Sequence, residues 1–141
     1  MDHVAIMKKS WKLIPKIIAG EKTIESRWYQ TRRAPWNCIK KGDRIFFKNT
    51  GEVVSVCARV SRVLQFEIKN ITEVEKIVAL YGKKICLRHT DPHLWRALPQ
   101  YCILVYLQNP KKIKTPFQIN KKGFGSATAW IVAKNIKMIQ M

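Results

Sequence analysis

The chain has 141 residues, which suffices for a single domain, 1–141, that buries about 70% of its unfolded surface without crosslinks. Its 27 lysine and arginine residues against 9 aspartate and glutamate residues give a net charge of +18. Such a surface favours polyanionic partners, of which nucleic acid is the most abundant. A solubilising coat, or a general lysine-rich composition, would explain the same excess without a partner.

Composition disfavours two other classes, membrane proteins and metalloproteins. The longest apolar run, residues 101–107, is far shorter than the roughly 20 residues that cross a bilayer, and the N-terminus lacks a secretory pattern. The four cysteines form no CxxC pair and the three histidines are scattered, which predicts reduced thiols and no metal site. We therefore expect a cytoplasmic protein with no membrane contact and no cofactor.

The N-terminal part of the chain predicts a strand, a helix and a second strand. Residues 3–7 read as the first strand, and residues 11–19 place four apolar side chains on one helical face. Gly20 ends this helix, since glycine adopts the left-handed conformation without a clash. Residues 23–28 then alternate, with one set facing a core and the other carrying Glu25 and Arg27.

The rest of the chain predicts a further set of strands around one clear helix. We expect strands at residues 44–48, 52–68, 101–107 and 128–133, the second of them bent near residues 61–64. The helix spans residues 72–82, with Thr72 as its cap and Gly82 at its end. A helical turn follows Pro92, a basic loop covers residues 109–114, and residues 117–126 form a flexible glycine-rich loop.

Charged side chains gather at the junction of the first helix and the second strand. Lys22 lies at the mouth of the strand, and Glu25 and Arg27 lie on one of its sides. Because unpaired charges are costly to bury, these groups are solvated, paired with one another, or placed in a cleft that takes a polar ligand. If they only pair with one another, they brace the helix-to-strand corner and have no ligand.

The pattern Gly20-x-Lys22-x-x-Glu25-x-Arg27 resembles the signature of ASCH domains, a branch of the PUA-like superfamily. The strands predicted before and after it fit the same resemblance, which extends over nearly the whole chain. The resemblance implies an α+β fold, namely a small PUA-like mixed β-barrel with flanking helices. It also implies a cleft lined by the Lys, Glu and Arg of the motif, and RNA as a partner.

The loop after the motif interleaves basic and aromatic residues, as in proteins that bind single-stranded nucleic acid. We therefore predict an RNA- or nucleotide-binding module in which cations contact phosphates and an aromatic side chain stacks on a base. Trp28 reads more simply as a core aromatic. The predicted ligand-binding residues are Lys22, Glu25, Arg27, Tyr29, Arg32, Arg33, Trp36, Lys40, Lys41, Lys121, Lys122 and Ser126.

An enzyme acting in the same cleft is the alternative, either a nucleoside amidohydrolase or a ribonuclease, since the ASCH family includes both. Its catalytic candidates are Lys22 and Glu25. Lys22 matches the amidohydrolase lysine, but Glu25 occupies the position of their threonine nucleophile. A neighbouring carboxylate also keeps a lysine protonated, which favours anion binding over general-base catalysis. The sequence leaves the choice between module and enzyme open, along with the oligomeric state.

Overall fold

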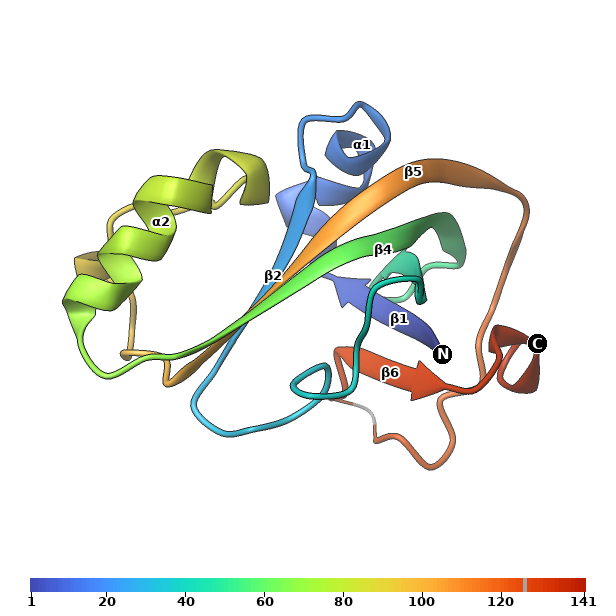
Figure 1. Cartoon of the computed structure of the whole chain (residues 1–141). Coiled ribbons are helices and arrows are strands. Elements are labelled where there is room, and N and C mark those ends of the chain that lie inside the picture. The colour runs from blue at the N-terminus through green and yellow to red at the C-terminus, as the bar shows by residue number, and fades with distance from the viewer. Residues whose placement is uncertain (126) are drawn as a thin grey trace.

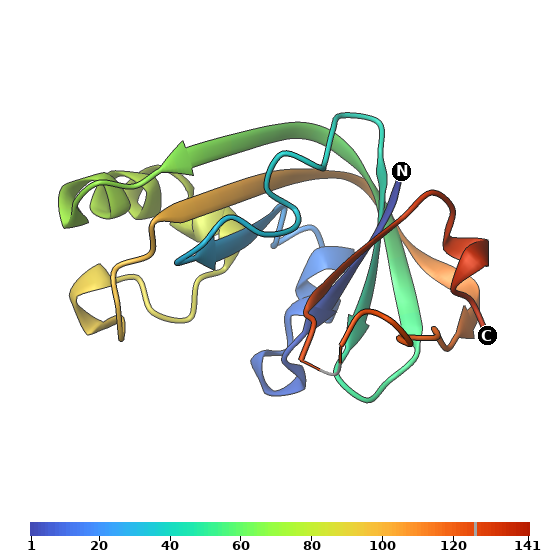
Figure 2. The ribbon, with the colours of Figure 1, turned by 90° about the horizontal axis from the view of Figure 1, so that it is seen from below.

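A single six-stranded sheet organises the computed structural model, which describes residues 1–125 and 127–141 (Figure 1). The strands are β1 (Asp2–Met7), β2 (Ile24–Tyr29), β3 (Arg44–Asn49), β4 (Val54–Glu67), β5 (Tyr101–Phe117) and β6 (Trp130–Ala133). Their order is β2-β5-β4-β3-β1-β6, and β1 pairs parallel with β3 while the other neighbours are antiparallel. The long strands β4 and β5 bend strongly, so the sheet is curved (Figure 2).

Strand β5 is longer than the sequence predicts. The expected basic loop at residues 109–114 is wrong, because this segment continues the strand and pairs with β4, Lys111 opposite Cys57 and Lys112 opposite Val56. Asn109 takes a left-handed φ of 52° there, and the β4–β5 register shifts at three places. One of these irregularities, between Val60 and Arg62, is next to the bend predicted at residues 61–64.

The helices are α1 (Leu13–Ile18) and α2 (Ile71–Ile85), with 3₁₀ turns η1 (Lys9–Trp11), η2 (Pro92–Leu94) and η3 (Ile136–Met138). The predicted ends of α2 are wrong at both termini. Asn70 rather than Thr72 is the cap, since its side chain accepts a hydrogen bond from the N–H of Glu73. The helix also continues past Gly82 to a left-handed Cys86.

The two faces of β5 pack against different helices. Ile103 and Val105 join the core cluster that contains the buried side of α1, whereas Cys102 and Leu104 join the cluster under α2. A third cluster lies where the C-terminal segment covers β1 and β3. No described helix is long and apolar enough to cross a bilayer.

Candidate ligand-binding cleft

Glu25 and Arg27 of the motif lie on β2, which is one edge of the sheet, and Gly20 and Lys22 lie just before it. The chain leaves α1 through Gly20, whose φ of +80° is the left-handed conformation predicted for it. Thr23 then donates its N–H to the carbonyl of Lys84, which ties the start of β2 to the last turn of α2. Because β5 pairs with only one side of β2, the other side faces the gap toward the opposite edge of the sheet.

Lys22 is enclosed at the junction of β2 and α2. Its Nζ donates to the carbonyl of Ile85 at 2.6 Å and to that of Ile24 at 2.9 Å, and it lies 3.2 Å from Glu25 Oε1. An ammonium group has three N–H donors, so these three acceptors satisfy it completely. In this arrangement Lys22 positions Glu25 and has no donor left for a ligand.

Glu25 is also buried, and it is paired on both oxygens. Oε1 faces Lys22 and accepts from the N–H of Ser26 at 3.1 Å, while Oε2 accepts from Arg27 Nη2 at 3.1 Å. Burial alone would raise the pKa of Glu25, but the charges of Lys22 and Arg27 outweigh it and hold that pKa below its ordinary value of 4.5. Glu25 is therefore an ionised hydrogen-bond acceptor.

Arg27 spans the gap between the two edges of the sheet. Its Nη1 donates to the carbonyl of Ala129 at 3.2 Å, and its Nη2 donates to that of Ile6 at 3.4 Å. The guanidinium carbon lies 5.0 Å from the ring centre of Trp130 on β6, within the range of a cation–π contact. One side chain thus joins β2 to β1 and β6 where no backbone ladder is formed.

Two adjoining cavities open on either side of the motif strand. The first has a volume of about 250 Å³ and lies between β2 and the segment that leaves α2, with Lys22, Ile85 and Leu87 in its wall. The second has a volume of about 420 Å³ and lies toward β1, with Lys8 and Arg27 in its wall. The residues that line both cavities are Trp11, Leu13, Glu25, Ser26 and Trp28.

Three tryptophans form the aromatic part of the first cavity. Trp28 and Trp95 meet edge to face, with ring centres 4.8 Å apart and planes at 83°. Their indole N–H groups are bonded within the protein, Trp28 to Ser26 Oγ at 3.0 Å and Trp95 to the carbonyl of His89 at 3.3 Å. Trp11 is 44% exposed at the boundary between the cavities.

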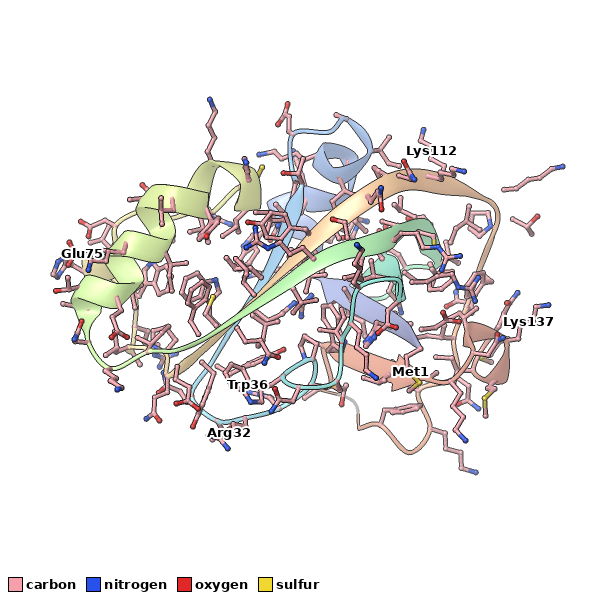
Figure 3. The ribbon with its side chains drawn as sticks, viewed as in Figure 1. Met1, Arg32, Trp36, Glu75, Lys112 and Lys137 are labelled. Atoms are coloured by element: carbon pink, nitrogen blue, oxygen red, sulfur yellow. The ribbon has the colours of Figure 1, made fainter. Side chains whose placement is uncertain are left out.

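Of the other predicted residues, Tyr29 lines the second cavity, and Arg33 stacks over its ring at 4.7 Å. Burial raises the pKa of Tyr29, although the charges of Arg27 and Arg33 oppose this shift. Arg32 pairs with Glu67 at 2.9 Å, and Trp36 packs edge to face on Tyr101 at 5.0 Å. Arg32 and Trp36 lie together on the loop after β2, well away from Lys112 (Figure 3).

The predicted lysines other than Lys22 lie on two separate turns outside these cavities. Lys40 and Lys41 are exposed in the turn before β3, where the carbonyl of Gly42 accepts from Arg59 at 3.0 Å. Lys121 and Lys122 lie in the turn after β5. Ser126 lies outside the described residues. The structure thus brings Lys22, Glu25, Arg27 and Tyr29 into one site, and the RNA contacts of the remaining residues stay predictions.

The sequence reading missed most of the first cavity's wall. Five of its residues come from η1, β2, the α2–η2 connection and the end of η2, namely Trp11, Ser26, Arg88, His89 and Trp95. No local pattern links these segments, since the docking of the end of α2 beside β2 brings them together. The signal available in the sequence was the density of tryptophan, five in the chain.

Comparisons with known proteins place this geometry in a structural class. No family model matches the sequence, and a search of curated proteins found no match. Among solved structures, the chain is similar to the ASCH protein from Zymomonas mobilis, with a TM-score of 0.67 and 18% identity over 97% of this chain and 91% of that one. A mutant form of that protein gives a TM-score of 0.68 and 17% identity, covering 97% of this chain and 93% of the other.

A curved mixed sheet with two flanking helices and a cleft along its edge strand defines a PUA-like α+β half-barrel. More narrowly, the chain has the ASCH fold over nearly its whole length. The predicted fold class and the predicted ASCH resemblance are therefore confirmed as statements about the fold.

Proposed function

We propose that this protein is an RNA- or nucleotide-binding module that takes its ligand in the cleft along β2. The observation that carries the proposal is the pair of cavities that share Glu25 and Ser26 as a wall. One cavity is lined largely by indole rings and aliphatic side chains, and the other is bordered by Lys8 and Arg27. A nucleotide has the matching parts, since its base is flat and its phosphate is anionic.

The charge of the chain supports the same class of ligand. The net charge is +18, and three of the nine carboxylates, those of Asp2, Glu25 and Asp43, are buried and paired. These carboxylates engage Lys22, Arg27 and Arg44, so the charges of the pairs cancel and the rest of the chain keeps the full positive excess. Positive charge supplies affinity for phosphates, while the shape and polar groups of the cleft supply selectivity.

The motif residues have different roles in this proposal. Glu25 is the polar group that a ligand meets, Lys22 positions it, and Arg27 lies in the wall on the phosphate side. The other predicted residues extend the binding surface along a longer RNA. They are Tyr29, Arg32, Arg33, Trp36, Lys40, Lys41, Lys121 and Lys122. We favour binding over catalysis, because a Lys22 that donates to three acceptors is an ammonium group, which would have to lose a proton before it could act as a base.

The test is a titration with labelled single-stranded RNA at several salt concentrations. We expect log affinity to fall linearly with log salt, by about 0.7 for each phosphate neutralised. Lys8→Gln should weaken binding and lower that slope, because Lys8 lines the phosphate side of the cleft. The matched control is Lys137→Gln, on η3 and outside the cleft, which should leave affinity near wild type (Figure 3). A flat salt response, or equal effects of the two variants, would contradict the proposal.

A further inference from the structure

The groups that line the cavity of Trp11, Trp28 and Trp95 further restrict which ligands it can bind. Both indole N–H groups of the Trp28–Trp95 pair are already bonded to protein oxygens. What these two rings offer a ligand is therefore their faces and carbon edges. Two rings at 83° allow a third flat ring to stack on one of them while it meets the other edge-on.

The cavity has a polar wall with one acceptor to offer. A carboxylate has about four acceptor positions, and described residues fill three of those on Glu25. Lys22 has no donor left, as shown above. The unfilled position on Glu25 is therefore on Oε2, the oxygen that accepts from Arg27, and it can accept one more hydrogen bond.

The charges around the cavity favour an uncharged ring over an ionic one. Lys22 and Arg88 line it together with Glu25, so the lining carries more positive than negative charge. This disfavours a quaternary ammonium group, although aromatic cages commonly bind such cations. The ionised carboxylate of Glu25 disfavours an anion at the same place.

We infer that this cavity receives one uncharged planar ring with a hydrogen-bond donor on its edge, with Trp11, Trp28 and Trp95 as its aromatic walls and Glu25 as its acceptor. The inference rests on the proposed function, and it names which part of a nucleotide enters and what that part must carry. Adenine and cytosine supply the donor with their exocyclic amino groups, and guanine and uracil supply one with a ring N–H. The neighbouring cavity with Lys8 and Arg27 then takes the phosphate.

Calorimetric titration with free nucleosides tests the donor requirement. We expect adenosine and cytidine to bind, and the matched analogues that lack the amino group to bind about tenfold more weakly or worse, because the last acceptor position of Glu25 would stay unfilled under the bound ring. Choline should not bind. Equal affinity for the amino and amino-free nucleosides, or binding of choline, would overturn the inference.

Substitutions of Trp11 test the aromatic walls separately from folding. Trp11 is 44% exposed, so its replacement should leave the fold intact. Trp11→Leu keeps an apolar side chain but no ring and should weaken adenosine binding about tenfold, whereas Trp11→Phe should stay within a few-fold of wild type. If Trp11→Leu binds adenosine like Trp11→Phe, Trp11 is not a stacking wall.

Parallel titrations with single-stranded RNA separate the two claims. If RNA binds with the expected salt dependence but no nucleoside binds, the ring cavity is wrong and the proposed function stands. If neither RNA nor any nucleoside binds, both are wrong.

Discussion

The ammonium group of Lys22 and the carboxylate of Glu25 lie 3.2 Å apart, with side chains that are only 1% and 4% exposed. A buried ion pair of this kind is costly to break from one side, because the remaining charge loses its partner in a poorly solvated place. The pair also holds Glu25 at the boundary between the two cavities.

Lys22→Met should therefore lower the free energy of unfolding by about 3 kcal/mol. Adding Glu25→Gln to Lys22→Met removes the unpaired charge and so relieves part of that penalty. The loss of stability in the double variant should therefore be smaller than the sum of the two single losses, by at least about 1 kcal/mol. Urea denaturation of the four proteins measures this coupling. Additive effects would show that the two groups are not paired in solution.

Arg27→Lys should weaken the link between the two edges of the sheet. A lysine cannot reproduce the forked contacts to Ile6, Glu25 and Ala129, so we expect a loss of about 2 kcal/mol in the free energy of unfolding. Arg32→Lys is the control, since Arg32 makes an exposed pair with Glu67 and should show no measurable change. Equal stability of Arg27→Lys and the wild type would contradict the bridging role.

The buried ring of His3 predicts a pH dependence of stability. Burial lowers its pKa below the ordinary 6.5, against the opposing effect of Asp43, whose Oδ2 lies 2.9 Å from His3 Nε2. His3 Nδ1 accepts from the indole N–H of Trp130 at 3.1 Å, an arrangement that requires the neutral ring. The unfolded chain then binds a proton more readily, so stability is constant above the unfolded pKa and falls as the pH drops below it.

We expect a lower urea midpoint at about pH 5.5 than at about pH 7.5. His3→Gln, which cannot be protonated, should shrink that difference even if it is less stable at both pH values. Four carboxylates have a lowered pKa, those of Asp2, Glu25, Asp43 and Glu52. Their ordinary pKa values are 3.8 and 4.5, so their effect on stability is lost below this pH window. An unchanged difference in His3→Gln would assign the pH effect elsewhere.

The double variant Arg32→Ala, Arg33→Ala tests the loop after β2 as part of the RNA surface. It should weaken binding of single-stranded RNA and lower the salt slope by about 1.4, since two phosphate contacts are lost. Lys134→Ala, Lys137→Ala removes the same charge from the C-terminal segment beyond β6 and should change the slope less. If both double variants lower the slope equally, only the total charge matters.

The sequence predicted the fold well where one residue type decides the local conformation. Gly20 ends the first helix at a positive φ, and the alternation after it places Ile24 in the core and Glu25 on the other side of the strand. It failed where a partner strand decides, as at residues 109–114, whose lysines and proline look like a loop until β4 pairs with them. The cap of α2 was misplaced because Thr72 and Asn70 are both good capping residues.

The candidate site was predictable only in its central part. The charged triad of Lys22, Glu25 and Arg27 lies within six consecutive residues at and just before one strand, so spacing alone reveals it. The cavity walls come from segments more than 60 positions apart, such as Trp11 and Trp95, and only tertiary packing brings them together. The saturation of Lys22 likewise depends on the carbonyl of Ile85, which no sequence pattern could reveal.

The most direct test of the cleft is an NMR titration that follows the five indole N–H signals as a short single-stranded RNA is added. The indoles of Trp11, Trp28 and Trp95 lie in the cleft, whereas Trp36 and Trp130 lie elsewhere. We predict that the first three signals shift together and saturate with the RNA. Binding that leaves those three signals unmoved would contradict the assignment of the β2 cleft as the ligand site.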